Sequence, residues 1–199
     1  MKIPTRDQCF RMMRAMKMMD HIVVHSLQVC RVATYLTEHL NRQNGRLNLD
    51  LIQAAALLHD ITKTRSFKTR EDHARTGGEY LADCGYPEIG ELIRQHVTLD
   101  NYSAGGTISD AEVLNYADKR VLHDEIVILD QRLDYILERY ATTREHKDRI
   151  YHLWIKTRDL EERIFSSLQF APEDIYSLIQ TQALSIEFQE FKHVCAHLS

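Results

Sequence analysis

The sequence predicts an all-α protein, and this prediction rests on composition and on periodicity. Hydrophobic residues make up 44% of the 199 residues and charged residues 27%, with only 7 glycines and 3 prolines. Such a composition favours a compact helical protein over a β-sandwich or a disordered chain. Apolar residues also recur at three- and four-residue steps in several segments, as they do in amphipathic helices. A chain of this length can bury one core without disulfides, so we expect a single-domain helical bundle.

The first two helices are predicted from apolar stripes. The segment from about Asp7 to Met19 has apolar residues at helical spacing, and its methionines form a flexible packing face. A second stripe begins in line with His25. The polar stretch around Gly45 ends this helix, and Asn48 or Asp50 would cap the next one.

The middle of the chain holds a predicted central helix. The string LDLIQAAALLHDITK, residues 49–63, is apolar on most sides, as expected of a helix inside a bundle. We expect a charged loop over residues 64–72 after it. Two short helices follow, with predicted limits at His73, Cys84–Gly85, Pro87 and about His96.

The next helix has a clear start signal. The glycine pair in residues 99–108 indicates a mobile connection. Ser109 follows, with Glu112 three residues on, which is the pattern of a capping box. Asp118 is therefore predicted at an interior helical position.

The C-terminal part is predicted to be helical too. Residues 121–167 show a long charged pattern typical of antiparallel helices, and a last helical stretch is expected over residues 173–197. No repeat or linker divides the chain. The predicted organisation is an N-terminal helix (residues 1–20), a core that holds the candidate functional residues (21–140) and a helical elaboration of the same domain (141–199).

Charge and cysteine content exclude several classes of function. The net charge of -4, from 25 basic and 29 acidic residues, gives no basic footprint for polymeric nucleic acid. The absence of close cysteine pairs argues against disulfides or a zinc knuckle and for a reducing compartment. No stretch approaches the roughly 20 apolar residues of a membrane span. We expect a soluble, cytoplasmic protein that binds neither membrane nor polymeric nucleic acid. The cysteines, Cys9, Cys30, Cys84 and Cys195, are interpreted as packing residues.

The candidate chemistry lies in a scattered set of histidines and aspartates. Its centre is the pair His59–Asp60, which follows a run of small and apolar residues and is thus carried into the interior, where unpaired polar groups are costly. A mixed His/Asp set without thiolates favours a first-row divalent metal in a hydrolytic site. An aspartate beside a histidine can bridge two ions about 3.5–4 Å apart, and the water between them is the natural nucleophile.

The order His, His-Asp, Asp, with its middle pair in a string like LLHDxxK, resembles the HD superfamily of metal-dependent phosphohydrolases over about half the chain, from Val24 to Lys119. The resemblance implies one metal site, formed by His25, His59, Asp60 and Asp118. It also implies a second site completed by His73, in DHARTGGEYL, and His96, in IRQHVT, with Asp60 as the bridge. This six-ligand set is similar to that of the bacterial diadenosine tetraphosphate hydrolases.

The chain departs from the family pattern at two points. Thr62 stands where many members have glycine, so the turn after Asp60 is expected to be less sharp. Val97 follows His96 where the cyclic-dinucleotide phosphodiesterases of the HD-GYP branch have a second histidine, and Gly85-Tyr86-Pro87 lies in the wrong place to be the GYP motif. The cyclic-dinucleotide interpretation is therefore disfavoured.

Lys63 is the candidate phosphate-binding side chain. If the helix persists it lies one turn beyond His59 on the same face, where its ammonium would meet a substrate phosphate as a point charge; the alternative is a solvated lysine at a helix end. Further candidates for phosphate contacts are Arg75, Arg94, Lys119 and Arg120. No chemistry is assigned to the remaining histidines, His21, His39, His123, His146, His152, His193 and His197.

These observations predict a hydrolase that cleaves a phosphoester or phosphoanhydride bond of a nucleotide or dinucleoside polyphosphate by attack of metal-activated water. Asp60 and Lys63 would be catalytic, Lys63 would also bind substrate, and one or two divalent ions would be bound: Fe, Mn, Co, Ni or Zn, with Mg as a further candidate. Substrate-selecting walls are expected around Thr62–Glu71 and Leu99–Ile108. The Met-rich N-terminal face favours a homodimer. Two alternatives stay open: a catalytically silent nucleotide- or metal-sensing module, and a di-iron oxygenase.

Overall fold

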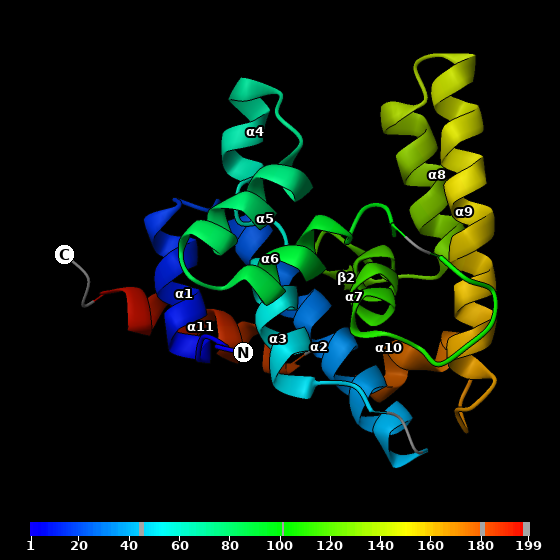
Figure 1. The fold of residues 1–199 in the computed structure, drawn as a ribbon, viewed down its shortest axis with the longest axis horizontal. Coiled ribbons are helices and arrows are strands. Elements are labelled where there is room, and N and C mark those ends of the chain that lie inside the picture. Colours follow the sequence, from blue (N-terminus) through cyan, green and yellow to red (C-terminus); the bar gives the residue numbers. More distant parts are fainter. Residues whose placement is uncertain (44–45, 101, 180–181, 197–199) are drawn as a thin grey trace.

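Helices dominate the computed structural model, which describes residues 1–43, 46–100, 102–179 and 182–196 (Figure 1). The helices are α1 (Arg6–Ala15), α2 (Asp20–Arg42), α3 (Leu49–Leu58), α4 (Lys63–Thr69), α5 (His73–Asp83), α6 (Pro87–Arg94), α7 (Asp110–Lys119), α8 (Leu129–Tyr140), α9 (Arg144–Phe165), the short 3-10 helix η1 (Pro172–Asp174), α10 (Ile175–Leu178) and α11 (Gln182–Ala196). Between α7 and α8 lies a small antiparallel hairpin, β1 (Val121–Leu122) and β2 (Glu125–Ile126). The all-α prediction is confirmed.

Several predicted helix starts are confirmed by their caps. Asn48, one of the two residues expected to cap α3, accepts a hydrogen bond from the backbone N–H of Leu51. Ser109 and Glu112 form the predicted capping box of α7. Asp72 caps α5, which begins at His73 as expected and ends at Asp83. Each cap satisfies backbone donors that the first helical turn leaves unpaired.

The core is centred on α3, as its sequence predicts. Helix α3 packs against α1, α2, α6 and α7. Its three consecutive alanines, Ala54, Ala55 and Ala56, are buried, which lets the neighbouring helices approach closely. Helix α2 contributes a second buried stripe that includes Val29, Val32 and Leu36. Helix α2, which carries His25, and helix α3, which leads into His59 and Asp60, are therefore both held in the core of the bundle.

Helices α5 and α6 cross at a pair of glycines. A Cβ built on Gly90 would lie 2.4 Å from the carbonyl oxygen of Gly78, and one built on Gly78 would lie 2.8 Å from the carbonyl oxygen of Gly90. Any side chain at either position would force the helices apart. This close crossing fixes the distance between the start of α5 and the end of α6.

Three element predictions were wrong. The central helix does not run to residue 63, because α3 ends at Leu58 and a turn follows. The charged stretch predicted as a loop forms α4, a surface helix without buried residues that ends where Arg70 adopts a left-handed φ of 58°. The long pattern over residues 121–167 is interrupted at its start by the β1–β2 hairpin, whose turn holds His123 at a φ of 58°. Short elements like these depend on tertiary contacts more than on periodicity.

Helix α1 packs against the last helix, α11. Helix α1 stops at Ala15, short of Met19, because Lys17 takes a left-handed φ of 52°. The ring of Phe10 packs edge-on against that of Phe191 on α11, with centroids 5.5 Å apart. The C-terminal stretch is divided into η1, α10 and α11. Gly45 and His197, which figured in the predicted helix limits, lie outside the described residues.

Much of the Met-rich N-terminal face is turned inward. Met13 and Met18 are buried in the core, and Met12 and Met16 are partly buried against it. The homodimer expected through this face stays a prediction, as does the division of the domain at residues 20 and 140. None of the described helices is long and apolar enough to cross a membrane.

Candidate metal centre

The six predicted ligands come from five parts of the chain and meet at one place. His25 lies on α2, His59 and Asp60 lie in the turn after α3, His73 is the first residue of α5, His96 follows α6 and Asp118 lies on α7. His73 is partly exposed, whereas the other five are buried. The structure thus brings together every residue that sequence reasoning named as a metal ligand.

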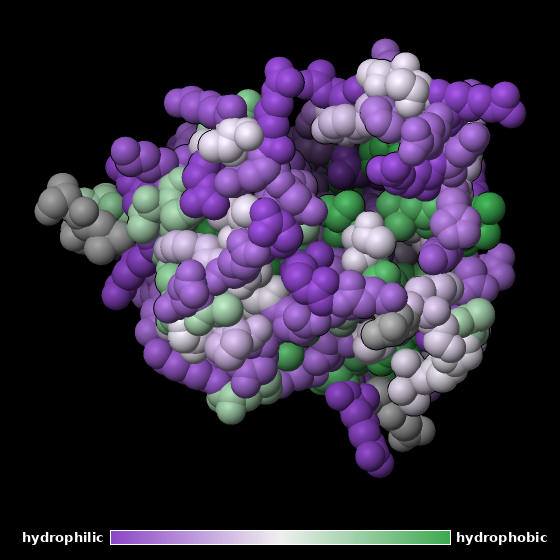
Figure 2. Space-filling model, turned by 45° about the horizontal axis from the view of Figure 1, so that its top comes forward, coloured by the Kyte–Doolittle hydropathy of each residue, from purple (hydrophilic) through white to green (hydrophobic). Residues whose placement is uncertain are grey.

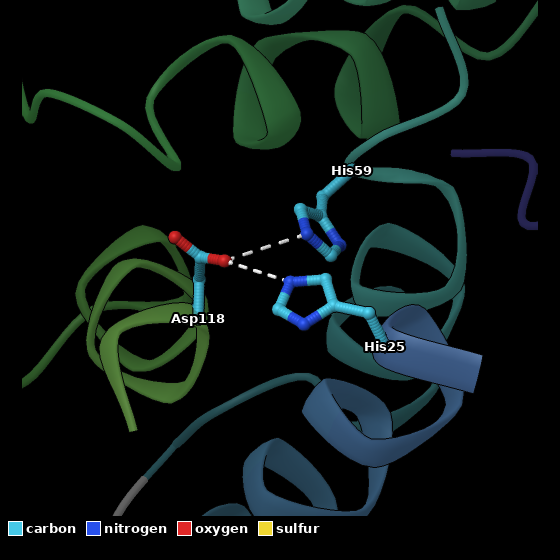
Figure 3. A group of neighbouring side chains, drawn as sticks. All are labelled: His25, His59 and Asp118. Atoms are coloured by element: carbon cyan, nitrogen blue, oxygen red, sulfur yellow. Dashed lines mark hydrogen bonds and ion pairs between the residues drawn. The ribbon is translucent and has the colours of Figure 1, made fainter. Parts of the chain in front are cut away.

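One group of donors consists of His25, His59 and Asp118 (Figure 3). Asp118 Oδ1 lies 3.2 Å from His25 Nε2 and 3.6 Å from His59 Nε2. Figure 3 shows both imidazole rings and the carboxylate pointing toward one another from three different segments. Two nitrogens and one oxygen at such separations can converge on a single ion.

The two oxygens of Asp60 face two different sets of imidazoles. Oδ2 lies 3.4 Å from His59 Nε2 and 4.0 Å from His25 Nε2, on the side of Asp118. Oδ1 lies 3.2 Å from His73 Nε2 and 3.7 Å from His96 Nε2. One carboxylate therefore connects both groups of candidate ligands, which is the position of a bridge between two ions.

Backbone carbonyls orient three of the imidazoles. Nδ1 of His25 donates to the carbonyl of His123 (2.8 Å), that of His59 to Ala56 (2.8 Å) and that of His96 to Ile93 (2.6 Å). When Nδ1 carries the proton, the neutral ring leaves a lone pair on Nε2, and this atom faces the centre in each case. The same arrangement orients histidine ligands in known metal sites.

Both carboxylates are held in their charged form. Burial disfavours the ionised form of Asp60, but Lys63 and His59 beside it keep the pKa of its carboxyl well below the usual range. Burial likewise opposes the ionisation of Asp118, and His25 and His59 keep its pKa well below the usual range. Two negative charges therefore stand at the centre at neutral pH.

The imidazoles respond to burial and to these charges in opposite ways. Burial, together with the neighbouring His59, lowers the pKa of His96 to about 3. Burial also lowers the pKa of His25. Although burial disfavours its charged form too, Asp60 and Asp118 raise the pKa of His59 to about 10. A proton on His59 thus occupies the place where the carboxylates attract a cation, and a metal ion would displace it.

The centre also contains orphaned polar atoms. His59 Nε2 and Asp60 Oδ1 are buried and, among the described residues, have no hydrogen-bond partner of acceptable geometry. Leaving such atoms unpaired costs about 1–3 kcal/mol each, and more for a charged group. Donor atoms of His25, His59 and Asp118, and those of His59, Asp60 and His96, lie within 4.8 Å of one another. The residues therefore fit a divalent metal.

Lys63 reaches the centre from a different helix than expected. Because α3 ends at Leu58, Lys63 does not continue its face but begins α4. Its Nζ donates to Asp60 Oδ2 at 2.7 Å. Burial disfavours the charged ammonium, but Asp60 raises its pKa, so Lys63 stays charged. The predicted position beside the HD pair is correct although the predicted helix is not.

Thr62, where many family members have glycine, ties two ligands together. The turn after Asp60 forms with a backbone hydrogen bond from Lys63 N to the Asp60 carbonyl (2.9 Å). The buried Thr62 hydroxyl then donates to the carbonyl of His73 at 2.8 Å and lies 3.1 Å from the Thr76 hydroxyl. The threonine thus connects the HD turn to the start of α5.

The other predicted phosphate contacts have structural partners. Lys119 is buried, and its Nζ donates to the carbonyls of His96 (2.8 Å) and Asn115 (3.2 Å), holding the segment after α6 against α7. Burial lowers the pKa of Lys119 to about 8. Arg120 is buried and donates to the carbonyls of Val127 and Pro172. Lys119 thus supports the segment that carries His96, whereas Arg120 joins α7 to the segments around Val127 and Pro172.

Arg75 and Arg94 lie on the surface. Arg75 pairs with Glu79 at 2.6 Å, and Arg94 pairs with Glu91 at 2.7 Å and with Asp100. Their charges are already neutralised by neighbours on their own surface, so the structure gives no support to a phosphate contact by either.

Sequence reasoning missed two residues that position ligands. The carbonyl of His123 holds His25, and the amide of Asn115 donates to the carbonyls of Gln95 (2.9 Å) and His96 (3.0 Å). His123 could have been identified as a turn residue, since histidine is enriched among non-glycine residues with positive φ. Nothing in the sequence marks Asn115, because its role depends on how α6 and α7 pack.

A model of the HD domain family matches residues 22–164, well over half of the chain. The chain belongs to the HD domain family. The matched region contains all six candidate ligands and runs past residue 140, into α9. HD domains bind divalent metals, in agreement with the two groups of donor atoms described above.

Individual relatives resemble only parts of this HD protein or resemble it loosely. Ribonuclease Y of Rubrobacter xylanophilus is 29% identical over 75 residues, which is 38% of this chain and 13% of that protein. A predicted HD superfamily hydrolase from an uncultured Thermotogales bacterium is known from its crystal structure. The structural match covers 83% of this chain and 94% of that protein's chain, with 22% sequence identity and a TM-score of 0.46. Neither likeness identifies a branch, so similarity to the diadenosine tetraphosphate hydrolases stays a prediction.

Proposed function

We propose that this HD protein is a metal-dependent phosphohydrolase that cleaves a phosphoester or phosphoanhydride bond in a nucleotide or dinucleoside polyphosphate. The observation that carries the proposal is the placement of Asp60, whose two oxygens face His59 and His25 on one side and His73 and His96 on the other. A buried carboxylate with imidazoles on both sides suits one or two divalent ions.

The six residues His25, His59, Asp60, His73, His96 and Asp118 would hold these ions. Fe, Mn, Co, Ni and Zn all suit such ligands, and Mg is a further candidate. Divalent ions bound here would polarise phosphoryl oxygens and lower the pKa of a bound water to about 7. The protein would then need no covalent intermediate, since the attacking group is water.

Lys63, which is partly exposed, would act on the substrate beside the buried Asp60. Its side chain is 29% exposed while its Nζ contacts Asp60 Oδ2. The ammonium can therefore meet a phosphate oxygen without leaving the carboxylate, and its charge would offset the negative charge that develops on the phosphoryl group. It would also keep Asp60 ionised, as a bridging ligand must be.

A cavity lined in part by Asn115, which donates to the carbonyl of His96, suits the organic part of a nucleotide. It measures about 290 Å³ and lies between the segment after α6 and helix α9. It begins at Val97, directly after His96, and Leu99, Tyr102, Leu153 and Leu160 give it an apolar lining. Apolar walls with a few polar groups are typical of small-molecule sites. The lining of this cavity includes none of the candidate ligands themselves, and neither does that of a second cavity, of about 760 Å³, near residues 104–108.

Product formation from a panel of phosphorylated compounds tests the proposal. Mono-, di- and cyclic nucleotides and dinucleoside polyphosphates would be incubated with the native chain and Mn, Fe, Co, Ni, Zn or Mg. The native protein should cut at least one of them, and Asp60→Ala should not. Asp83→Ala, which changes an exposed aspartate at the end of α5, is the matched control. Absence of cleavage with every metal would favour the sensing module or the oxygenase instead.

A further inference from the structure

Arg132 on α8 lies outside the candidate ligand set but has an unusual environment. Its side chain is partly buried, and its Nε is buried with no hydrogen-bond partner in the part of the chain that the structure describes. A donor of a charged group is among the most costly to leave unpaired. Buried polar atoms without partners are rare in native proteins and call for an explanation, such as an ion or ligand that supplies the partner.

Arg132 belongs to a chain of contacts that ends at the metal centre. Its guanidinium lies 5.8 Å from the ring centre of Tyr135, and this ring packs edge-on against His123 with centroids 5.3 Å apart. The carbonyl of the same His123 accepts the hydrogen bond that orients His25. The first turns of α8 are therefore anchored directly beside a candidate ligand.

Two other cations, Lys63 on α4 and Lys119 on α7, lie at the carboxylates of the centre. Lys63 contacts Asp60 at 2.7 Å, and Lys119 lies 4.0 Å from Asp118. Lys119 is occupied by backbone carbonyls. Lys63 pairs with Asp60 but is partly exposed, and Arg132 Nε has no partner among the described residues, so these two cations can still meet an anion.

The two available cations come from opposite walls. Helix α4 and the α8–α9 pair project from the same side of the bundle as separate arms (Figure 1). When this side is turned toward the reader, the surface is hollowed between them (Figure 2). A compact anion held by Lys63 at the metals would leave Arg132 without a partner, but an anion with two linked phosphates can extend from one cation to the other. The guanidinium fork also matches a phosphate in a two-point contact.

We propose that Arg132 binds a second phosphate group, adjacent to the one positioned by Lys63, so that the site selects substrates with two or more linked phosphates over monophosphates. This deepens the proposed function and rests on it for the place of the first phosphate. Phosphoanhydrides are then the substrate class, in preference to simple phosphomonoesters.

Anion binding to the metal-loaded protein tests this inference without relying on turnover. The affinities of methylenediphosphonate, a stable analogue of two linked phosphates, and of orthophosphate would be measured by calorimetry for the native chain, Arg132→Gln and Arg132→Lys. The native protein should bind the diphosphonate at least about tenfold more tightly than orthophosphate. Arg132→Gln should lose about tenfold in affinity for the diphosphonate and none for orthophosphate. Arg132→Lys should lose less affinity for the diphosphonate, because lysine keeps the positive charge but lacks the two-pronged guanidinium group.

Arg139→Gln, an exposed arginine on the same helix, is the control and should bind both anions as the native chain does. Thermal unfolding without ligand checks that each variant folds. If Arg132→Gln does not fold, Arg132→Lys takes its place as the test variant. An equal loss for both anions in Arg132→Gln, or no loss for either, would overturn the inference. If the preference for the diphosphonate depends on Arg132 but no substrate is hydrolysed, the inference holds and the proposed hydrolysis fails. If substrates are hydrolysed but Arg132→Gln keeps the native preference for the diphosphonate, the proposed hydrolysis holds and the inference fails.

Discussion

Lys63 donates a hydrogen bond of 2.7 Å to Asp60 Oδ2, across the turn that separates α3 from α4. This contact joins the candidate bridging carboxylate to a cation that is still partly exposed to substrate. The turn between the two residues is closed by the hydrogen bond from Lys63 N to the Asp60 carbonyl and carries both side chains of the contact, so the turn is part of the site.

Replacing this lysine should impair turnover more than metal binding. In Lys63→Gln the amide can still donate to Asp60, but the charge that meets the substrate phosphate is lost. We expect kcat/KM for the preferred substrate to fall about a hundredfold, with the bound metal content close to that of the native protein. Steady-state kinetics and metal analysis of the same sample check this. Lys68→Gln, an exposed lysine on α4, should behave as the native chain; a Lys63→Gln enzyme with full activity would refute the assigned role.

The crossing of α5 and α6 should tolerate no side chain. In Gly90→Ala the new Cβ would lie 2.4 Å from the carbonyl of Gly78, so the helices must separate. We expect a loss of roughly 1–3 kcal/mol in the free energy of unfolding, measured by urea denaturation. Because α5 carries His73 and α6 leads to His96, affinity for a second metal ion should fall as well. Gly105→Ala, where a Cβ meets nothing within 4 Å, is the control, and equal stability of the two variants would contradict the packing described here.

The threonine in the HD turn should matter for the position of His73. Thr62→Val keeps the shape of the side chain and removes the hydroxyl that donates to the His73 carbonyl at 2.8 Å. Loss of one buried hydrogen bond with an unpaired carbonyl left behind should cost about 1–3 kcal/mol of stability. Urea unfolding measures this cost, and Thr69→Val, at the exposed end of α4, provides the comparison. If Thr62→Val and Thr69→Val unfold alike, the hydroxyl does not hold α5.

A pH dependence is expected from Glu161 on α9. Burial raises the pKa of this carboxyl above its ordinary value of 4.5, although Tyr116 donates a hydrogen bond to it and Arg120 pairs with it at 3.4 Å. The folded protein therefore holds a proton on Glu161 more tightly than the unfolded chain does. Its contribution to stability is complete below pH 4.5 and is lost as pH rises through the raised pKa.

The variant Glu161→Gln removes this titration. The difference in the free energy of unfolding between the variant and the native chain should shift in favour of the variant as pH rises above 4.5, and denaturant titrations at several pH values measure it. Glu162→Gln, on the exposed side of α9, controls for the loss of one surface charge. A difference that shifts in the opposite direction would show that the ion pair with Arg120 outweighs burial.

The sequence was informative where chemistry depends on residue type and adjacency. His59 and Asp60 stand side by side after an apolar run, so their burial and their joint role could be read directly, and the capping box at Ser109 placed Asp118 on a helix. Periodicity identified the longer helices because each buries one apolar stripe along many residues. The family relationship followed from the same ligand residues and not from the fold.

What could not be predicted depends on packing between elements. Helix α4 has no buried residue, so the sequence contains no apolar stripe that would predict it. The end of α3 at Leu58 accompanies contacts that His59 and Asp60 make in the metal centre, such as that of Asp60 with His73 on α5. The roles of Asn115 and Arg132 likewise depend on which segments lie opposite α7 and α8. Single-sequence reasoning contains no information on such neighbours.

The most direct test of the central claim is the origin of the oxygen in the product. The metal-loaded native chain and Asp60→Asn would act on the preferred substrate in water labelled with a heavy oxygen isotope, and mass spectrometry would locate the label. We predict one labelled oxygen in the released phosphate or phosphorylated product of the native chain, a requirement for added metal, and no turnover by Asp60→Asn. A product whose new oxygen carries no label from water, as expected if it came from molecular oxygen, or turnover that survives Asp60→Asn, would contradict hydrolysis at this centre.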